Sequence, residues 1–188
     1  GEGYVPNTFD GLKKLLSGTA NEITSQVSLK TSAELDSNCN AFLDEMDSFL
    51  SCLDGSASLL LMNRAMLVKL RSIARRAGYY ERTRDDFGRV VETYAGIPMV
   101  DMGSYYNGAS TQDVVQTSGG KTAIYAVSLG LDGFHGISPV GDGVISSYMP
   151  DLTAPGAVKT GEVELVAGVA LKNTLKAAVL KDIPIAAE

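Results

Sequence analysis

Histidine and cysteine are scarce in this sequence, and their scarcity limits the chemistry that it can support. The 188 residues contain one histidine, His135, and two cysteines, Cys39 and Cys52. A single histidine in an expected strand is more often structural than catalytic. Neither cysteine has an activating sequence context, and no G-x-S-x-G nucleophile motif is present. Nucleophilic catalysis is therefore not expected.

The two cysteines are also poorly placed for a disulfide, because both lie in or at the end of one expected helix. They could not meet without bending that helix, so a reducing, intracellular setting is expected. Long apolar runs are lacking as well, since none reaches the ~18 residues of a membrane span. The polar, glycine-rich start GEGYVPNTFDGL does not resemble a signal peptide. We expect no membrane contact.

Positive charge is in deficit. Lysine and arginine number 16 against 22 acidic residues, which gives a formal charge of −6. Broad, phosphate-driven binding of nucleic acid is not expected from this balance, although a local basic patch could still act. The hydrophobic share of 45% and the charged share of 20% are typical of a globular chain. The length fits one domain, or one domain with a small appendage.

Two amphipathic helices are the clearest local signals. Thr31 and Glu34 have the spacing of a capping box, and apolar residues then recur at three- and four-residue intervals as far as Asp54-Gly55. A second helix is predicted from the N-cap Asn63 to Gly78, where a left-handed C-terminal residue is expected. A shorter anchoring helix is predicted within residues 9–16.

Short apolar or alternating runs predict strands around these helices. The stretch VVETYAGIPMVDMG reads as two strands broken at Ala95-Gly96, and residues 79–94 read as a hairpin with its turn near Gly88. Residues 103–121 are polar and glycine-rich, which predicts a long exposed loop. The other expected strands lie at 26–31, 58–62, 122–130, 132–138, 143–149 and 162–183. The three strands at 122–130, 132–138 and 143–149 are expected to form a meander. For the second half of 162–183, a helix is the alternative.

These elements together predict an α+β fold, with two main helices on a mostly antiparallel central sheet. Apolar residues of the helices and of the strands between them are expected to share one core. This predicted core comprises Leu43, Met46, Leu50, Leu60, Leu67, Leu70, Ile97 and Val100.

Acidic clusters and a glycine-rich segment give no convincing metal or phosphate site. Asp44, Glu45 and Asp47 read as the solvated face of a helix, and Asp85-Asp86 reads as a turn without a calcium-loop pattern. The segment SGGK at 118–121 lacks the full phosphate-loop motif and precedes a strand rather than a helix. No metal or cofactor is expected.

One basic, aromatic cluster stands out between the second helix and the following hairpin. Arginines at 71, 75, 76, 82 and 84 accompany Tyr79 and Tyr80, while Glu81, Asp85 and Asp86 neutralise much of their charge. Balanced charge beside tyrosines suits a protein interface better than nucleic acid, because aromatic residues and arginine are enriched in interface hot spots.

Three segments in order resemble a known family. LLLMNRAMLVKLRSIARRAG, YYERTRDDFGRVVETYAGIPMVDMG and KTAIYAVSLGLDGFHGI resemble the axial-domain half of major capsid proteins of tailed DNA bacteriophages, which share the Hong Kong 97-like fold with encapsulins. The resemblance implies an axial domain at 31–159. It implies a peripheral-domain remnant with closing strands at 1–30 and 160–188. The N-terminal arm, extended hairpin and long spine helix of that family have no counterpart here, so this chain by itself is expected to assemble poorly.

The resemblance implies a structural role rather than an enzymatic one. The subunit would self-assemble into pentamers and hexamers that enclose double-stranded DNA, with scaffold, protease and portal proteins as further partners, in a virion assembled in the bacterial cytoplasm. No cofactor is implied. The subunit interface would be the loop at the capsomer axis, formed by Tyr79, Tyr80, Glu81, Arg82, Arg84, Asp85, Asp86 and Arg89.

Two other functions remain open on the residues alone. One is an enzyme of unrecognised type that uses Asp85, Asp86 or His135. The other is a phage accessory or tail module that binds a partner through residues 103–121.

Overall fold

The computed structural model describes residues 9–78, 81–84, 90–139, 144–150, 153 and 155–186. Its helices are α1 (Leu12–Leu16), α2 (Ser32–Ser51) and α3 (Arg64–Ala77), with the short 3₁₀ helix η1 at Thr174–Lys176. Its strands are β1 (Glu22–Thr24), β2 (Leu59–Met62), β3 (Glu81–Arg84), β4 (Val90–Tyr94), β5 (Ile97–Asp101), β6 (Ser104–Tyr106), β7 (Thr111–Asp113), β8 (Lys121–Val127), β9 (Phe134–Ile137), β10 (Ile145–Tyr148), β11 (Glu162–Leu165), β12 (Gly168–Leu171) and β13 (Ala177–Pro184).

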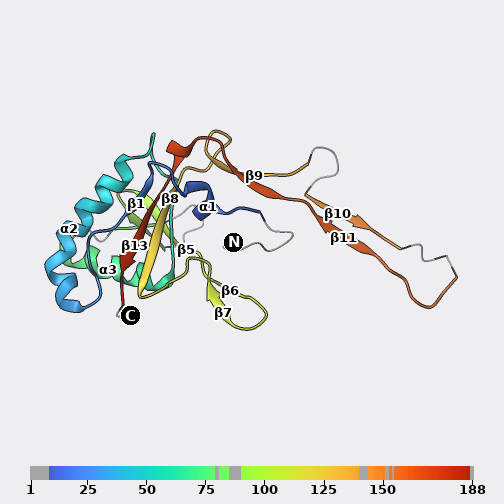
Figure 1. Ribbon diagram of the computed structural model, residues 1–188, viewed down its shortest axis with the longest axis horizontal. Helices are drawn as coiled ribbons and strands as arrows, with labels where there is room; N and C mark the ends of the chain where they lie inside the picture. Colours follow the sequence, from blue (N-terminus) through green and yellow to red (C-terminus); the bar gives the residue numbers. More distant parts are fainter. Residues whose placement is uncertain are drawn as a thin grey trace.

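The body of the molecule is built on one sheet of seven strands in the order β1-β13-β8-β2-β5-β4-β3 (Figure 1). Two neighbouring pairs, β1–β13 and β2–β5, are parallel, and the other pairs are antiparallel. The sheet is therefore mixed but mostly antiparallel, as predicted. Segments from both predicted domains share it, because β1 and β13 pair with each other and β13 pairs with β8.

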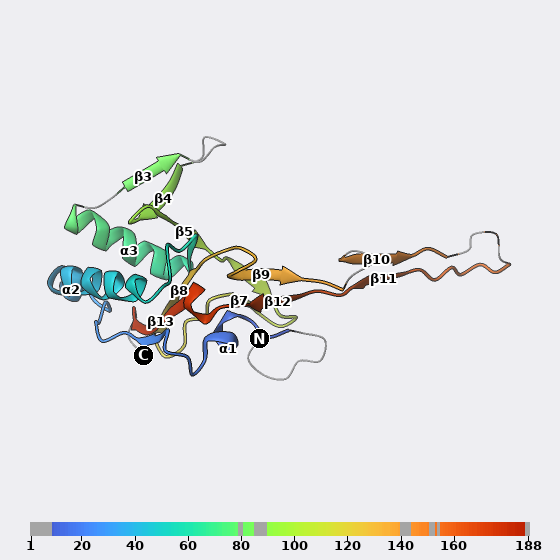
Figure 2. The same cartoon turned by 90° about the horizontal axis from the view of Figure 1, so that it is seen from above.

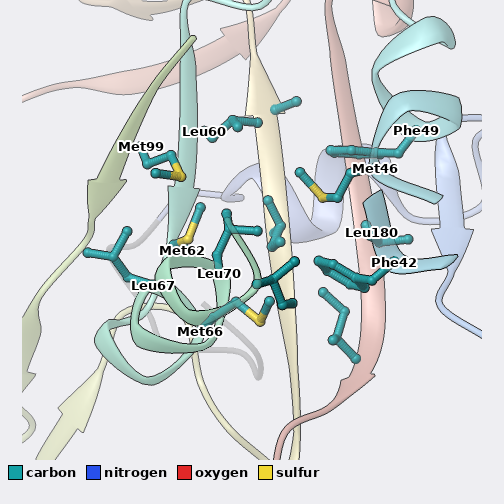
Figure 3. Packing of buried hydrophobic residues seen from close by; sticks show 14 of the residues in the cluster. Phe42, Met46, Phe49, Leu60, Met62, Met66, Leu67, Leu70, Met99 and Leu180 are labelled. Carbon is teal, nitrogen blue, oxygen red and sulfur yellow. The ribbon is translucent and has the colours of Figure 1, made fainter. Parts of the chain in front are cut away.

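Helices α2 and α3 cover one face of this sheet and form the main core with it (Figure 3). Phe42, Met46 and Phe49 of α2 are fully buried there, and so are Leu60 of β2 and Leu70 of α3. The predicted core is confirmed, with Leu50 half-buried against it, except at Val100, which is half-buried and lies outside this cluster. Successive residues of a strand face opposite sides of the sheet, so Ile97 and Met99 point toward the helices and Val100 points away.

A smaller apolar cluster lies on the other face of the sheet. It comprises Leu16 of α1, Val127 of β8, and Ala177 and Val179 of β13. The short helix α1 thus anchors the start of the described chain against β13, in agreement with the anchoring role predicted for residues 9–16. No helix within the described ranges is both long and apolar enough to cross a membrane.

The predicted helix ends are confirmed in detail. The Thr31 hydroxyl accepts from the Glu34 N–H at 3.2 Å, and the Glu34 carboxylate accepts from the Thr31 N–H at 3.1 Å. The Asn63 side chain accepts from the Met66 N–H at 2.9 Å, and Gly78 ends α3 with φ of 76°. These short-range interactions need no tertiary context, which is why the sequence predicts them well.

The hairpin between β4 and β5 explains the proline in the stretch VVETYAGIPMVDMG. Ala95 and Gly96 both have positive φ, 49° and 76°, and form a two-residue turn closed by the Tyr94–Ile97 pair. In such hairpins the closing pair exchanges backbone hydrogen bonds and the next pair, here Thr93–Pro98, does not. Pro98 therefore interrupts no bond to β4, and the pairing of β5 with β2 begins one residue later, at Met99.

The structure differs from the sequence-based expectation in two segments before β8. The strand expected at 26–31 is absent, and the chain forms β1 at Glu22–Thr24 instead. The long loop expected at 103–121 contains the β6–β7 hairpin and a tight turn at Gly119-Gly120. Both strands of that hairpin are three residues long, and most of their side chains are exposed, so no hydrophobic alternation marks them.

Strands β9, β10, β11 and β12 form a ribbon that projects far from the body of the molecule (Figures 1 and 2). The strands predicted at 132–138 and 143–149 exist, but the meander expected for them is wrong. β9 pairs with β12 at the base of the ribbon, and β10 pairs with β11 farther out. The C-terminal strand is confirmed as β13. Of the helix considered as an alternative for the second half of 162–183, only the three-residue η1 is formed.

Candidate subunit interface

The predicted interface falls on the β3–β4 hairpin, at one edge of the main sheet (Figure 2). β3 carries Glu81, Arg82 and Arg84, which pair in register with Thr93, Glu92 and Val90 of β4. The hairpin form predicted for this segment is thereby confirmed. The remaining predicted interface residues, Tyr79, Tyr80, Asp85, Asp86 and Arg89, lie outside the described residues.

Strand β4 is fastened to both helices. Arg71 of α3 forms a salt bridge with Glu92, whose side chain is only 13% exposed. The Tyr94 hydroxyl donates to the Asp47 carboxylate of α2 at 2.7 Å. The β4 strand of the hairpin is therefore fixed to the helices that form the core.

Two arginines of the basic cluster, both on α3, form separate salt bridges. Arg71 is engaged with Glu92, and Arg76 forms a salt bridge with Asp36 that links α3 to α2. Arg75 is exposed on α3. Arg71 and Arg76 are thus surface arginines whose guanidinium groups also link neighbouring elements of the fold.

The acidic group on α2 also has a structural use that the sequence did not reveal. Glu45 is half-buried and accepts hydrogen bonds from the Ser25 hydroxyl at 2.6 Å and the Gln26 N–H at 2.7 Å. It ties down the segment that leads from β1 to α2. The expectation of a purely solvated acidic face holds for Asp44, which is exposed, but is wrong for Glu45.

Carboxylates with shifted pKa values lie at junctions between elements. A hydrogen bond from the Lys181 ammonium at 2.8 Å is the main cause that lowers the pKa of Glu22, and the Gly18 N–H adds to it. Hydrogen bonds from the Thr31 N–H and then the Ser28 hydroxyl lower the pKa of Glu34. These pairs fasten β1 to β13 and cap α2, so their shifts reflect structural contacts.

Of the residues considered for catalysis, the structure describes His135, Cys39 and Cys52, while Asp85 and Asp86 lie outside the described residues. His135 is half-buried in β9, opposite Ala170, and its Nδ1 lies 3.3 Å from the Gly133 carbonyl. Cys39 and Cys52 are free thiols. No group of three or more histidine, cysteine, aspartate or glutamate side chains among the described residues could hold a metal ion.

Sequence reasoning missed one surface, the outer part of the ribbon. Its strands carry apolar side chains that the fold leaves exposed, including Ile145, Val163 and Leu165. The alternation in EVELV predicts a strand, which the structure confirms as β11, but it does not show that both faces of this strand lie outside the main sheet.

Comparison with known proteins identifies the architecture. No protein-family model matches the chain, and a search of curated proteins finds no match. A solved structure, the cryo-electron microscopy structure of the holo-SrpI encapsulin complex from Synechococcus elongatus PCC 7942, superimposes with a TM-score of 0.64 at 18% sequence identity. This chain has an encapsulin-like fold. The match covers 88% of this chain and 54% of the encapsulin chain, so the chain spans about half the length of that protein.

Proposed function

We propose that this protein is the structural subunit of a self-assembling protein shell. The observation that carries the proposal is the likeness of its fold to an encapsulin over 88% of the chain. Residues 31–159 would form the axial domain, and 1–30 with 160–188 the peripheral remnant.

In its finer form the proposal is a bacteriophage or prophage capsid. Subunits would form pentamers and hexamers around double-stranded DNA, without sequence-specific contact, in a virion assembled in the bacterial cytoplasm. Scaffold, protease and portal proteins would be its further partners. The formal charge of −6 suits a wall that encloses DNA without gripping it. A shell that holds protein instead of DNA would keep the same fold and the same subunit contacts.

We assign the ring contact to the β3–β4 hairpin and the loop at its end. Rings need heterologous contacts, in which one patch meets a different patch on the neighbour. The segment 79–89 carries Glu81, Asp85 and Asp86 beside Arg82, Arg84 and Arg89, so it can offer acid to one neighbour and base to the other. Exposed pairs are each worth only about 0–1 kcal/mol, so several together set register more than strength.

Sedimentation velocity of the full-length protein tests the shell. We expect particles far larger than a monomer, and ultraviolet absorbance with nuclease protection would report whether they hold DNA. Protected DNA supports the capsid form, whereas particles without nucleic acid support a protein-filled or empty shell. A protein that stays monomeric at all concentrations would contradict both.

Charge reversal tests the ring contact separately. Changing Arg82 and Arg84 to Glu should block ring formation while the monomer stays folded, and adding Asp85→Lys and Asp86→Lys should restore part of it. Arg75→Glu, on the exposed face of α3, is the matched control. Normal assembly of the Arg82/Arg84 variant at low salt would move the contact away from this hairpin.

A further inference from the structure

The outer ribbon is an amphipathic two-stranded structure. Residues directly opposite each other in an antiparallel pair point to the same face, and faces alternate along each strand. Ile145 pairs with Leu165 and Ser147 with Val163, which places these four on one face. Ser146 pairs with Glu164 and Tyr148 with Glu162, on the opposite face, which therefore carries two charged side chains beside the exposed Tyr148 and, by the same alternation, the exposed Val144 and Val166. We call the first the apolar face, defined by Ile145, Val163 and Leu165, and the second the acidic face.

The apolar face is open to solvent in the isolated chain. Ile145, Val163 and Leu165 are 65%, 75% and 65% exposed. The ribbon extends away from the main sheet and helices in both views, so the body of the same molecule does not cover it (Figures 1 and 2). A lone two-stranded ribbon is at best marginally stable in water, and packing of its apolar face would stabilise it. Covering this face with a partner would therefore stabilise the ribbon.

Charge on the ribbon restricts what that partner is. Glu162 and Glu164 lie side by side on β11, and the protein carries a formal charge of −6. Nucleic acid and anionic membranes are poor partners for such a surface, because like charges repel. The partner surface must be apolar, and it must leave the glutamates in water.

A second copy of the same ribbon meets both conditions. Two ribbons packed through their apolar faces form a four-stranded sandwich, with apolar side chains between the layers. The glutamates of both copies then point outward, away from each other. Packing through the acidic faces would instead bring four carboxylates together. The arrangement is self-complementary, as a two-fold contact requires.

We propose that the apolar face of the β10–β11 ribbon docks on the same face of a second copy of this chain. The contact joins two molecules about a two-fold axis. Two copies suffice to make this contact. The contact rests on the proposed shell function only where a place for it in a larger assembly is concerned.

Paired aspartate substitutions in the full chain test the contact. Leu165→Asp puts a charge on the apolar face, and Tyr148→Asp, at a side chain 56% exposed, puts the same charge on the acidic face. Both positions are exposed in the monomer, so both variants should fold, which circular dichroism would check. Because Leu165 enters a two-fold contact from both sides, Leu165→Asp should weaken self-association measured by sedimentation by about 100-fold or more. Tyr148→Asp should change it by less than about tenfold.

Cysteine cross-linking keeps the test valid if an aspartate variant misfolds. In a background with Cys39→Ser and Cys52→Ser, Val163→Cys should form disulfide-linked dimers on mild oxidation, and Tyr148→Cys should not. Cross-linking of both or of neither, equal effects of the two aspartates, or a wild type that never self-associates would overturn the proposal. Shells that form normally with Leu165→Asp would leave the shell function standing and the ribbon contact wrong. Dimers that form through the ribbon without any shells would leave the ribbon contact standing and the shell function wrong.

Discussion

Replacement of Asn63 by Ala would test how the body of the fold is held together. The Asn63 side chain is fully buried where β2 ends and α3 begins. Its oxygen accepts from the Met66 N–H at 2.9 Å and caps the helix. Its nitrogen lies 3.0 Å from the Val115 carbonyl, and 2.9 Å from the hydroxyl oxygens of Thr117 and Thr122. One amide thus joins a strand, a helix and the segment that follows the β6–β7 hairpin.

The expected loss has two parts. Removal of an N-cap costs about 1 kcal/mol. A buried acceptor left without its donor, here the Val115 carbonyl, costs about 1–3 kcal/mol. Together they predict that Asn63→Ala lowers the free energy of unfolding by about 2–4 kcal/mol. In a chain of this length each kcal/mol moves Tm by about 2–4 °C, so Tm should fall by about 4–16 °C.

Urea unfolding followed by circular dichroism measures this loss and can divide it. Asn63→Ser keeps a capping oxygen but removes the amide donors, so it should lose only the second part, about 1–3 kcal/mol. Asn40→Ala, at an exposed position within α2, is the control and should change stability by less than about 0.5 kcal/mol. A loss below about 0.5 kcal/mol for Asn63→Ala, or equal losses for the Ala and Ser variants, would refute this reasoning.

Three further predictions concern other contacts. Leu70→Ala should cost about 2–5 kcal/mol in urea unfolding because Leu70 is fully buried, whereas Val68→Ala on the exposed side of α3 should cost less than about 1 kcal/mol, and equal losses would show that the helix face is misplaced. Thr93→Val should stabilise the protein by about 1 kcal/mol in thermal unfolding, because the buried Thr93 hydroxyl has no hydrogen-bond partner among the described residues, and a loss would show that it has one. The Glu22–Lys181 pair should stabilise the fold at neutral pH, since the pKa of Glu22 lies below its ordinary 4.5 and that of Lys181 above its ordinary 10.5. This contribution should fade as pH falls below 4.5 or rises above 10.5, so Glu22→Gln should flatten both ends of the stability profile, and an unchanged profile would contradict the assignment.

The helices could be predicted because their signals are local. Thr31, Glu34, Asn63 and Gly78 act within one turn of the helix ends that they define, and the apolar period of α2 and α3 marks the faces that pack on the sheet. The Ala95-Gly96 break likewise marks a turn that the backbone requires.

The pairing of strands could not be predicted in the same way. β9 finds β12, and β1 pairs in parallel with β13 from the far end of the chain. Such contacts depend on the whole topology. Strands as short as β6 and β7 also show no alternation of hydrophobic and polar residues from which they could be predicted. The strand expected at 26–31 was wrong for another reason. Side-chain hydrogen bonds from Ser25 and Asn38 hold this segment in place, so it does not need to pair as a strand.

The candidate interface at 79–89 stays a prediction. Mixed charge and tyrosines in 79–89 indicated a protein contact, and the resemblance to capsid proteins placed it at an axis. The apolar ribbon face was missed because a strand that is exposed in one chain and covered in an assembly has the same pattern as a strand buried in a core.

Cryo-electron microscopy of the full-length protein tests the central proposal most directly. We predict closed particles in which each subunit contains the seven-stranded sheet with α2 and α3 on one face, and in which the β3–β4 hairpins converge on the symmetry axes of the rings. Dispersed monomers at micromolar concentration and above, or particles with these hairpins directed away from every neighbour, would contradict it.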